Sequence, residues 1–137
     1  KMGKGHTLTE IRKHSHQDET YQLGIDFDGV IHRCSKGFHD GTIYDDLLPG
    51  AREAIEELSK SYVLICYTAK ARSDRPLVGG KTGTELVKEW LLGHDLLKYF
   101  KDVTAEKPRA VCYIDDKGIR FTDWPSAIKT LKSLKIL

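Results

Sequence analysis

The sequence has no long hydrophobic run and few cysteines. No apolar stretch approaches the roughly 20 residues that a membrane-spanning helix needs, and the first twenty residues contain no secretory signal. The 3 cysteines are an odd set, and Cys66 and Cys112 lie within apolar segments, so we expect reduced thiols and no disulfide framework. These absences favour a cytoplasmic protein that does not enter a membrane.

An excess of charge of one sign is also lacking. The 22 Lys and Arg residues nearly balance the 20 Asp and Glu residues, which leaves a formal net charge of +2. Overall charge therefore does not favour binding to nucleic acids or acidic membranes, and any basic surface must be local. Composition is compatible with an oligomer but does not indicate one.

The chain is long enough for one domain. Its 137 residues, 39% hydrophobic and 31% charged, are typical of a folded domain. We expect residues 1–20, which contain few apolar positions, to form a polar tail, and residues 21–137 to form the domain. His14 and His16 in the tail lack further ligands at metal-binding spacing, so a solvated tail is favoured. Because the sequence starts at Lys1, we also expect a trimmed chain or a piece of a longer protein.

Strand-like and helix-like segments alternate after residue 21. Apolar runs predict strands at residues 23–27, 62–67, 102–104, 110–114 and 119–121. Apolar positions at helical spacing predict three helices, containing Ala51, Ala54, Ile55 and Leu58, then Leu86, Val87, Trp90 and Leu91, then, after Asp123, Ala127, Ile128, Leu131 and Leu134. Gly93 is expected to end the second helix, and residues 96–100 to add a further helical turn. This alternation predicts a three-layer, Rossmann-like α/β fold with a central, mostly parallel five-stranded sheet.

Polar residues follow three of the predicted strands. Asp26 and Asp28 come at the end of the first strand, Thr68 follows the second, and Asp115 and Asp116 end the fourth. We expect them to meet in one crevice, because parallel α/β sheets bind ligands at the carboxyl ends of their strands. Four carboxylates repel one another unless a cation lies between them, and oxygen ligands select Mg²⁺. The sequence therefore predicts a magnesium site.

Three segments carry a family resemblance. Residues 24–30 read Gly-Ile-Asp-Phe-Asp-Gly-Val, residues 64–68 read Leu-Ile-Cys-Tyr-Thr, and residues 111–116 read Val-Cys-Tyr-Ile-Asp-Asp. In this order the segments resemble the first, second and fourth motifs of the haloacid dehalogenase (HAD) superfamily of phosphohydrolases, and the resemblance covers residues 21–137. It implies a HAD-type fold. The segments between the motifs are too short for a cap domain, so we expect a small, capless phosphatase with an open site.

The resemblance implies roles for individual residues. Asp26 is expected to attack phosphorus and form an aspartyl-phosphate, and Asp28 to protonate the leaving group and then activate the hydrolytic water. Thr68 is expected to donate a hydrogen bond to the phosphoryl oxygens, and Lys107 to neutralise their charge. The resemblance thus describes a phosphoric monoester hydrolase.

A metal site is implied as well. Mg²⁺ would be bound by the carboxylate of Asp26, the backbone carbonyl of Asp28 and the carboxylate of Asp116. Asp115 would not touch the metal but would support Asp116. The phosphate-binding lysine is less well defined, because Lys107 stands only eight residues before Asp115, closer than is usual in the superfamily. Lys101 and Lys117 remain alternatives for that lysine.

The expected substrate is phosphorylated. An open site favours nucleotide or polynucleotide phosphate ends, followed by small phosphate esters. The loop after Thr68 contains Lys70, Arg72, Arg75 and Lys81 against a single Asp74, and such an excess could follow a polyanion, although a solvated loop is the commoner case. Residues 80–82 lack the first glycine of a P-loop, so we do not expect an ATP site. Residues 30–49 are long enough only for a short flap. Its polar residues His32, Arg33, Lys36 and His39 are expected either to contact substrate or to be plain surface residues.

Two other interpretations remain open. Receiver domains of response regulators also use an acidic pair, an aspartate, a threonine and a lysine around Mg²⁺, but their acidic pair follows the first strand, whereas here it comes last. The second alternative is a non-catalytic or regulatory module of HAD fold within a larger protein.

Overall fold

The structure, a computed structural model, describes residues 21–110, 112–115, 119–134 and 137. Its strands are β1 (Gln22–Asp26), β2 (Val63–Tyr67), β3 (Phe100–Thr104), β4 (Cys112–Asp115) and β5 (Ile119–Arg120). Its α-helices are α2 (Ala51–Ser59), α3 (Gly83–Gly93) and α4 (Trp124–Ser133), and two short 3₁₀ helices are η4 (Ala69–Ala71) and η5 (Leu97–Tyr99). The predicted tail lies outside the described residues. Among the described helices, none combines the length and apolar character needed to cross a bilayer.

The strands form one parallel sheet in the order β3-β2-β1-β4-β5. β1 is central, so that Ile25 pairs with Cys66 of β2 on one side and with Ile114 of β4 on the other. The predicted α/β class with a parallel sheet is confirmed. β5 is only two residues long, and β3, predicted from residue 102, begins two residues earlier at Phe100.

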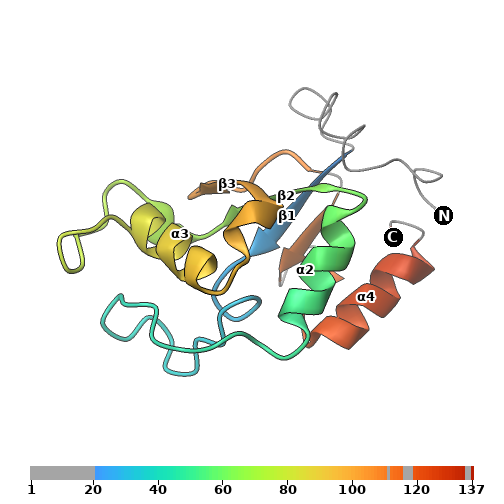
Figure 1. The fold of residues 1–137 in the computed structure, drawn as a ribbon, viewed down its shortest axis with the longest axis horizontal. Helices are drawn as coiled ribbons and strands as arrows, with labels where there is room; N and C mark the ends of the chain where they lie inside the picture. The colour runs from blue at the N-terminus through green and yellow to red at the C-terminus, as the bar shows by residue number, and fades with distance from the viewer. Residues whose placement is uncertain (1–20, 111, 116–118, 135–136) are drawn as a thin grey trace.

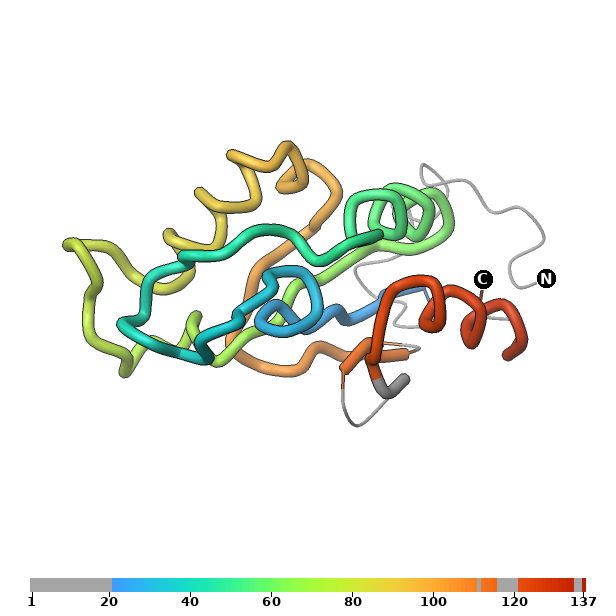
Figure 2. Tube along the Cα trace, turned by 90° about the horizontal axis from the view of Figure 1, so that it is seen from below, coloured from blue at the N-terminus to red at the C-terminus, as the bar shows by residue number. Residues whose placement is uncertain are grey.

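One face of the sheet carries the core. Alternating residues of the strands, such as Leu23 and Ile25 of β1 and Leu64 and Cys66 of β2, are fully buried. They pack in a single cluster with apolar residues of all three α-helices, namely Ala51, Ala54, Ile55, Leu58, Val87, Leu91, Trp124, Ala127 and Leu131. All three helices therefore cover the same face, as Figures 1 and 2 show.

The opposite face differs from the expected three-layer arrangement. No helix covers it in the described part of the chain, because the connection from β3 to β4 is too short for a crossover helix. Residues 105–110 pass over this face instead (Figure 2). The side chain of Gln22 donates to the carbonyl of Arg109 (2.6 Å), and a Cβ on Gly24 would lie 3.4 Å from the ring of Pro108. The same Cβ would lie 2.8 Å from Cδ1 of Tyr113 and 3.2 Å from Cε1 of Tyr67, so these two rings on the neighbouring strands are the contacts that explain a glycine in the central strand.

Most predicted helix boundaries are confirmed. Asp123 caps α4 by accepting a hydrogen bond from the backbone of Ser126 (2.8 Å), and α3 ends at Gly93. The N-terminus of α3 is a capping box in which Thr82 and Glu85 bond each other's backbone. The prediction that the last helix buries Leu134 is wrong, because the helix stops at Ser133 and Leu134 is 55% exposed.

Candidate functional site

The carboxyl ends of three neighbouring strands carry most of the predicted site residues. Asp26 and Asp115 are the last residues of β1 and β4, Thr68 directly follows β2, and Asp28 lies two residues beyond β1. The register places Asp26 beside Tyr67, and the Ile25–Ile114 pair puts Asp115 at the same level. The structure thus brings these side chains to one edge of the sheet. Asp116 lies outside the described residues.

This edge coincides with the reversal of strand order. From β1 the chain runs to β2 and β3 on one side of the sheet and then crosses to β4 on the other. Open α/β sheets bind ligands at such a switch point, outside the carboxyl ends of the two diverging strands. Here the diverging strands are β1 and β4, which end in the acidic residues Asp26 and Asp115.

A tight turn positions Asp28. The carbonyl of Phe27 accepts hydrogen bonds from the backbone N–H groups of Val30 (3.2 Å), Ile31 (2.9 Å) and His32 (3.1 Å). Gly29 adopts φ 80°, a left-handed conformation that other residues adopt with strain, although a Cβ would meet nothing within 4 Å. The glycine is therefore needed for backbone conformation, and the turn holds Asp28 against the end of β1.

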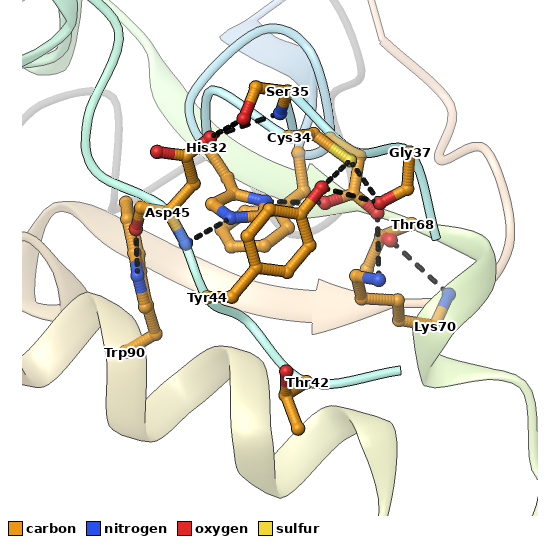
Figure 3. Close-up of polar contacts among 12 residues, drawn as sticks. His32, Cys34, Ser35, Gly37, Thr42, Tyr44, Asp45, Thr68, Lys70 and Trp90 are labelled. Atoms are coloured by element: carbon orange, nitrogen blue, oxygen red, sulfur yellow. Dashed lines mark hydrogen bonds and ion pairs between the residues drawn. The ribbon is translucent and has the colours of Figure 1, made fainter. Parts of the chain in front are cut away.

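Both oxygens of the Asp28 carboxylate have partners. Oδ1 lies 2.9 Å from Nδ1 of His32, and Oδ2 lies 3.2 Å from Nζ of Lys70; Figure 3 shows both partner side chains. Burial raises the pKa of Asp28, but the hydrogen bond from His32 and the positive charge of Lys70 outweigh it and hold the pKa below its usual value. Asp28 is thus kept as a carboxylate that faces two donors.

His32 is fixed in one tautomer. Its Nε2 accepts a hydrogen bond from the backbone N–H of Asp45 (3.0 Å), so the ring proton resides on Nδ1, which donates to Asp28. The ring is fully buried, stacks on Phe27 with centroids 5.5 Å apart, and meets the edge of Trp90 at 5.6 Å. From the sequence, His32 is expected only on a flap, since no local pattern indicates that the flap folds back over this turn.

Lys70 is the second residue whose position was not foreseen. It lies in η4, two residues after Thr68, and is only 6% exposed, whereas its loop was predicted to be polar. Its ammonium forms an ion pair with Asp28 and lies 4.8 Å from the ring centre of Phe38, but among the described residues no acceptor has hydrogen-bond geometry toward Nζ. The available sequence signal was its position two residues after Thr68, the polar residue that follows β2.

Thr68 is oriented by its backbone. Its N–H donates to the carbonyl of Thr104 (2.9 Å), and its hydroxyl oxygen accepts from the N–H of Lys70 (3.2 Å) as the cap of η4. The residue is buried. A hydroxyl that accepts one hydrogen bond still has its proton to donate, so Thr68 can bind an anion at the strand ends.

Lys107 reaches the site through Asp115. Its ammonium lies 3.0 Å from Oδ2 of Asp115 and 4.4 Å from the ring centre of Tyr113, and the same carboxylate accepts a hydrogen bond from Tyr67. Lys101, an alternative for the phosphate-binding lysine, instead bonds Gln22 at the start of β1 and so lies at the other end of that strand. Lys117, the other alternative, lies outside the described residues.

The remaining cations of the loop after β2 are largely engaged. Arg72 forms an ion pair with Asp74 (2.8 Å), and Lys81 forms one with Glu89 (2.8 Å). Arg75 lies 5.2 Å from the ring centre of Phe38. Within this loop, Lys70 and Arg75 are therefore the two cations that approach the flap.

Asp28, His32 and Cys34 form a cluster whose ligand atoms lie within 4.8 Å of one another. Both nitrogens of His32 already take part in hydrogen bonds, and the thiol of Cys34 donates to the carbonyl of Gly37 (3.1 Å). Burial raises the pKa of the Cys34 thiol, and the charge of Asp28 acts in the same direction. A metal needs a thiolate and a free nitrogen lone pair, so this cluster fits a hydrogen-bond network better than a metal site.

The strand-end residues fit Mg²⁺ by the chemistry of their donors. Asp26 ends β1 with a carboxylate, and Asp28 follows two residues later with its backbone carbonyl as a further oxygen donor. Asp115 ends the adjacent β4, where its Oδ2 accepts from Tyr67 and pairs with Lys107, which suits a residue that supports a metal ligand. Hard oxygen ligands of this kind suit Mg²⁺ rather than a softer metal. One oxygen of Asp26 also accepts a hydrogen bond from the N–H of Phe27 (2.8 Å), which fixes the carboxylate.

Comparison of the chain with known protein families, with curated proteins and with solved structures gave no significant match. Any function assigned to it therefore rests on the residues and the geometry described above.

Proposed function

We propose that this chain is a Mg²⁺-dependent phosphohydrolase of the HAD superfamily that acts through an aspartyl-phosphate. One observation carries the proposal: Asp26, Asp28, Thr68 and the Lys107–Asp115 pair meet at the carboxyl ends of β1, β2 and β4, where the strand order reverses. This collects a nucleophile, an acid and base, a hydroxyl donor and a cation in one place, which are the parts that phosphoryl transfer needs.

In the first proposed step, an oxygen of Asp26 attacks phosphorus. A bond from Asp26 to phosphorus forms, the bond from phosphorus to the leaving-group oxygen breaks, and Asp28 gives that oxygen a proton. Thr68 donates a hydrogen bond to a phosphoryl oxygen. In the free protein, His32 and Lys70 lower the pKa of Asp28 and so disfavour its protonated form. The negative charge of a bound phosphate raises the pKa of Asp28, which lets the residue carry the proton that it gives to the leaving group.

In the second step, Asp28 removes a proton from water as the water oxygen attacks phosphorus. The bond between Asp26 and phosphorus breaks, and inorganic phosphate leaves. The lowered pKa of Asp28 suits this step, because the residue begins as a carboxylate once its proton has gone to the leaving group.

Mg²⁺, held by the Asp26 carboxylate, the Asp28 carbonyl and the Asp116 carboxylate, with Asp115 supporting Asp116, would supply positive charge to the phosphoryl oxygens. Lys107 adds a fixed positive charge beside Asp115, 3.0 Å away. The proposed substrates are phosphate monoesters, with nucleotide and polynucleotide ends as the leading class. The described part of the chain has no separate cap domain, which leaves the strand ends accessible to such ligands.

Phosphate release is the direct test. We would compare a generic aryl phosphate, mononucleotides and oligonucleotides phosphorylated at the 3′ or 5′ end, with and without Mg²⁺. Release is expected only with Mg²⁺, and Asp26→Asn should lower it at least about 10³-fold because the nucleophile is lost. Asp102→Asn is the matched control, since Asp102 makes the same bond to its neighbouring N–H (2.8 Å) but lies on the edge strand.

The intermediate can be tested separately. With an activated aryl phosphate, which leaves without a proton donor, Asp28→Asn should still be phosphorylated but should hydrolyse slowly. Acid quenching should then show covalently bound phosphate in Asp28→Asn and none in Asp26→Asn. Release that is unaffected by Asp26→Asn would contradict the mechanism, and no release from any substrate would favour a regulatory module.

A further inference from the structure

A pocket of about 220 Å³ lies beside Asp28, between the flap and the loop after β2. The two segments touch at Gly41, where a Cβ would lie 3.1 Å from Val78 and 3.2 Å from Phe38. Its lining includes Phe38, Asp40, Gly41, Lys70, Arg75 and Leu77, and we call it the Phe38 pocket. Lys70 belongs both to this pocket and to the ion pair with Asp28, so the pocket adjoins the candidate site through this side chain.

Lys70 points to an anionic ligand. Its Nζ is buried and has no hydrogen bond among the described residues, although an ammonium group has three N–H donors. The one close acceptor among the described residues is Oδ2 of Asp28 at 3.2 Å, so at least two of the three donors of this buried ammonium are unused, which is unfavourable. An oxyanion in the pocket would supply the missing acceptors.

The rest of the lining points to a flat apolar group. Two apolar side chains of the lining are exposed: Phe38 by 50% and Leu77 by 61%. Together they form an apolar surface between the otherwise polar flap and the polar loop after β2. Two cations flank the ring, with Lys70 Nζ at 4.8 Å and the Arg75 guanidinium at 5.2 Å from its centre. The pocket thus combines an aromatic wall with two positive charges.

One carboxylate also lines the pocket. Oδ1 of Asp40 accepts hydrogen bonds from the backbone N–H (3.0 Å) and the hydroxyl (2.5 Å) of Thr42. These bonds turn that oxygen toward the flap itself. The two cations therefore outnumber the single anion in the pocket, and the anion is already hydrogen-bonded.

We propose that the Phe38 pocket binds the leaving group of the substrate and selects one with a flat apolar part and a second anionic group, which Lys70 and Arg75 bind. This inference rests on the proposed phosphohydrolase function, in which Asp28 serves the leaving group. Lys70 pairs with Asp28, the residue that serves the leaving group in the proposed mechanism, so we assign a group bound in this pocket to the leaving group rather than to the transferred phosphoryl. The substrate class is accordingly an aromatic phosphate ester with a second phosphate or carboxylate.

The test uses ligands that cannot turn over. Calorimetry on the wild-type protein with Mg²⁺ would compare benzylphosphonate with 4-carboxybenzylphosphonate, which differ only in the second anionic group. We expect the carboxylated ligand to bind about tenfold more tightly, as one added charge-assisted hydrogen bond predicts. Arg75→Gln should reduce this preference to about threefold or less, and Lys70→Met should reduce it further.

The matched control is Arg72→Gln, which removes an arginine of the same loop whose guanidinium pairs with Asp74 outside the pocket lining. It should keep the tenfold preference. Equal affinity for the two phosphonates, no binding of either, or a preference that Arg75→Gln leaves unchanged would each overturn the inference.

Turnover separates this inference from the proposed function. Phosphate release from phenyl phosphate and 4-carboxyphenyl phosphate at equal rates would overturn the pocket assignment and leave the phosphohydrolase standing. A binding preference that depends on Arg75, together with no release from any ester, would support the pocket and overturn the phosphohydrolase.

Discussion

The Asp28 carboxylate is set by two neighbours of different kinds. His32 is neutral where it meets Asp28, because its Nε2 accepts from Asp45 and only Nδ1 carries a proton. Lys70 contributes a charge but no hydrogen bond of good geometry. His32 therefore fixes the direction of the carboxylate, while Lys70 stabilises its ionised form.

Removing the His32 bond should raise the pKa of Asp28. In His32→Phe the new ring can keep the stack on Phe27, but burial of Asp28 is then opposed by Lys70 alone. A carbon-detected NMR titration of the Asp side chains, with Asp28 assigned from Asp28→Asn, would measure the shift. His39→Phe is the matched control, since His39 is exposed and contacts Tyr44 instead. An unchanged pKa in His32→Phe would contradict the role assigned to this bond.

Asp45 has a strongly lowered pKa, and hydrogen bonds are the cause. The hydroxyl (2.6 Å) and backbone N–H (3.0 Å) of Ser35, together with the backbone N–H of Asp46 (3.0 Å), lower the pKa to about 2. Ser35→Ala keeps the backbone bond and removes the hydroxyl, so the pKa should rise toward the usual value near 3.9. The same NMR titration would show this, and Ser73→Ala in the other loop should leave Asp45 unchanged.

The sign of the stability effect follows. The pKa of Asp45 is lower in the folded chain than in the unfolded chain, so its ionised form stabilises the fold above pH about 4. That contribution is lost as the pH falls from about 4 through about 2. Ser35→Ala should therefore lose less stability over this window than the wild type, and an equal loss in both would contradict the assignment.

Single residues differed in how far the sequence revealed them. Asp26, Asp28 and Thr68 follow apolar strands directly, and the strand pattern was enough to place them at one edge. His32 and Lys70 could not be placed in this way, since each depends on a loop folding back against another segment. Their contacts are tertiary, and no periodicity in the chain reports them.

At the scale of elements, η4 and the start of α3 are packed unusually tightly. A Cβ on Gly83, the first residue of α3, would lie 1.6 Å from the carbonyl oxygen of Lys70 and 2.5 Å from its carbonyl carbon. The two backbones therefore touch where the Phe38 pocket is formed. Any side chain at this position must separate α3 from η4.

Gly83→Ala should destabilise the fold by more than about 1 kcal/mol, because the new methyl group meets backbone atoms that can move only with their element. Urea denaturation would measure the free energy of unfolding. Gly93→Ala is the matched control at the other end of α3, where a Cβ meets nothing within 4 Å. It should be neutral or stabilising by up to about 1 kcal/mol, since alanine favours helix. Equal effects in the two variants would show that α3 and η4 are not in contact.

The elements themselves were largely predictable, because caps and periodicity are local. Asp123 and Gly93 marked helix ends correctly, and the buried positions of α2 match its helical spacing. The error at Leu134 arose because the spacing pattern continues one residue beyond Ser133, where the helix stops. The start of β3 was missed because Phe100 followed a helical pattern rather than an alternating one.

At the scale of the whole molecule, the helices lie on one side of the sheet. Sequence alternation predicted helices between parallel strands, and a right-handed crossover puts α2 and α3 on the same face, because β2 and β3 are added in the same direction from β1. A helix on the opposite face requires a long connection between β3 and β4. The sequence length of that connection, about seven residues, already excluded one, and the expectation of three layers overlooked this.

Collecting acidic side chains at one edge should make the stability of the whole molecule depend on Mg²⁺. A ligand that binds only the folded chain stabilises it, and at ten times its dissociation constant the gain is about 1.4 kcal/mol. For a chain of this size we expect the melting temperature to rise by roughly 3–6 °C. Differential scanning calorimetry in MgCl₂, against NaCl of equal ionic strength, would measure the rise without any turnover.

The Mg²⁺-dependent rise in melting temperature should be lost only in variants that remove a carboxylate assigned to the metal. Asp26→Asn should abolish the Mg²⁺-dependent rise, because one of the oxygen ligands becomes a neutral amide. Asp102→Asn, which removes an exposed carboxylate from the middle of the edge strand, should keep the full rise. An equal rise in both variants would mean that Mg²⁺ acts on general surface charge, and the strand-end carboxylates would then have no special affinity for it.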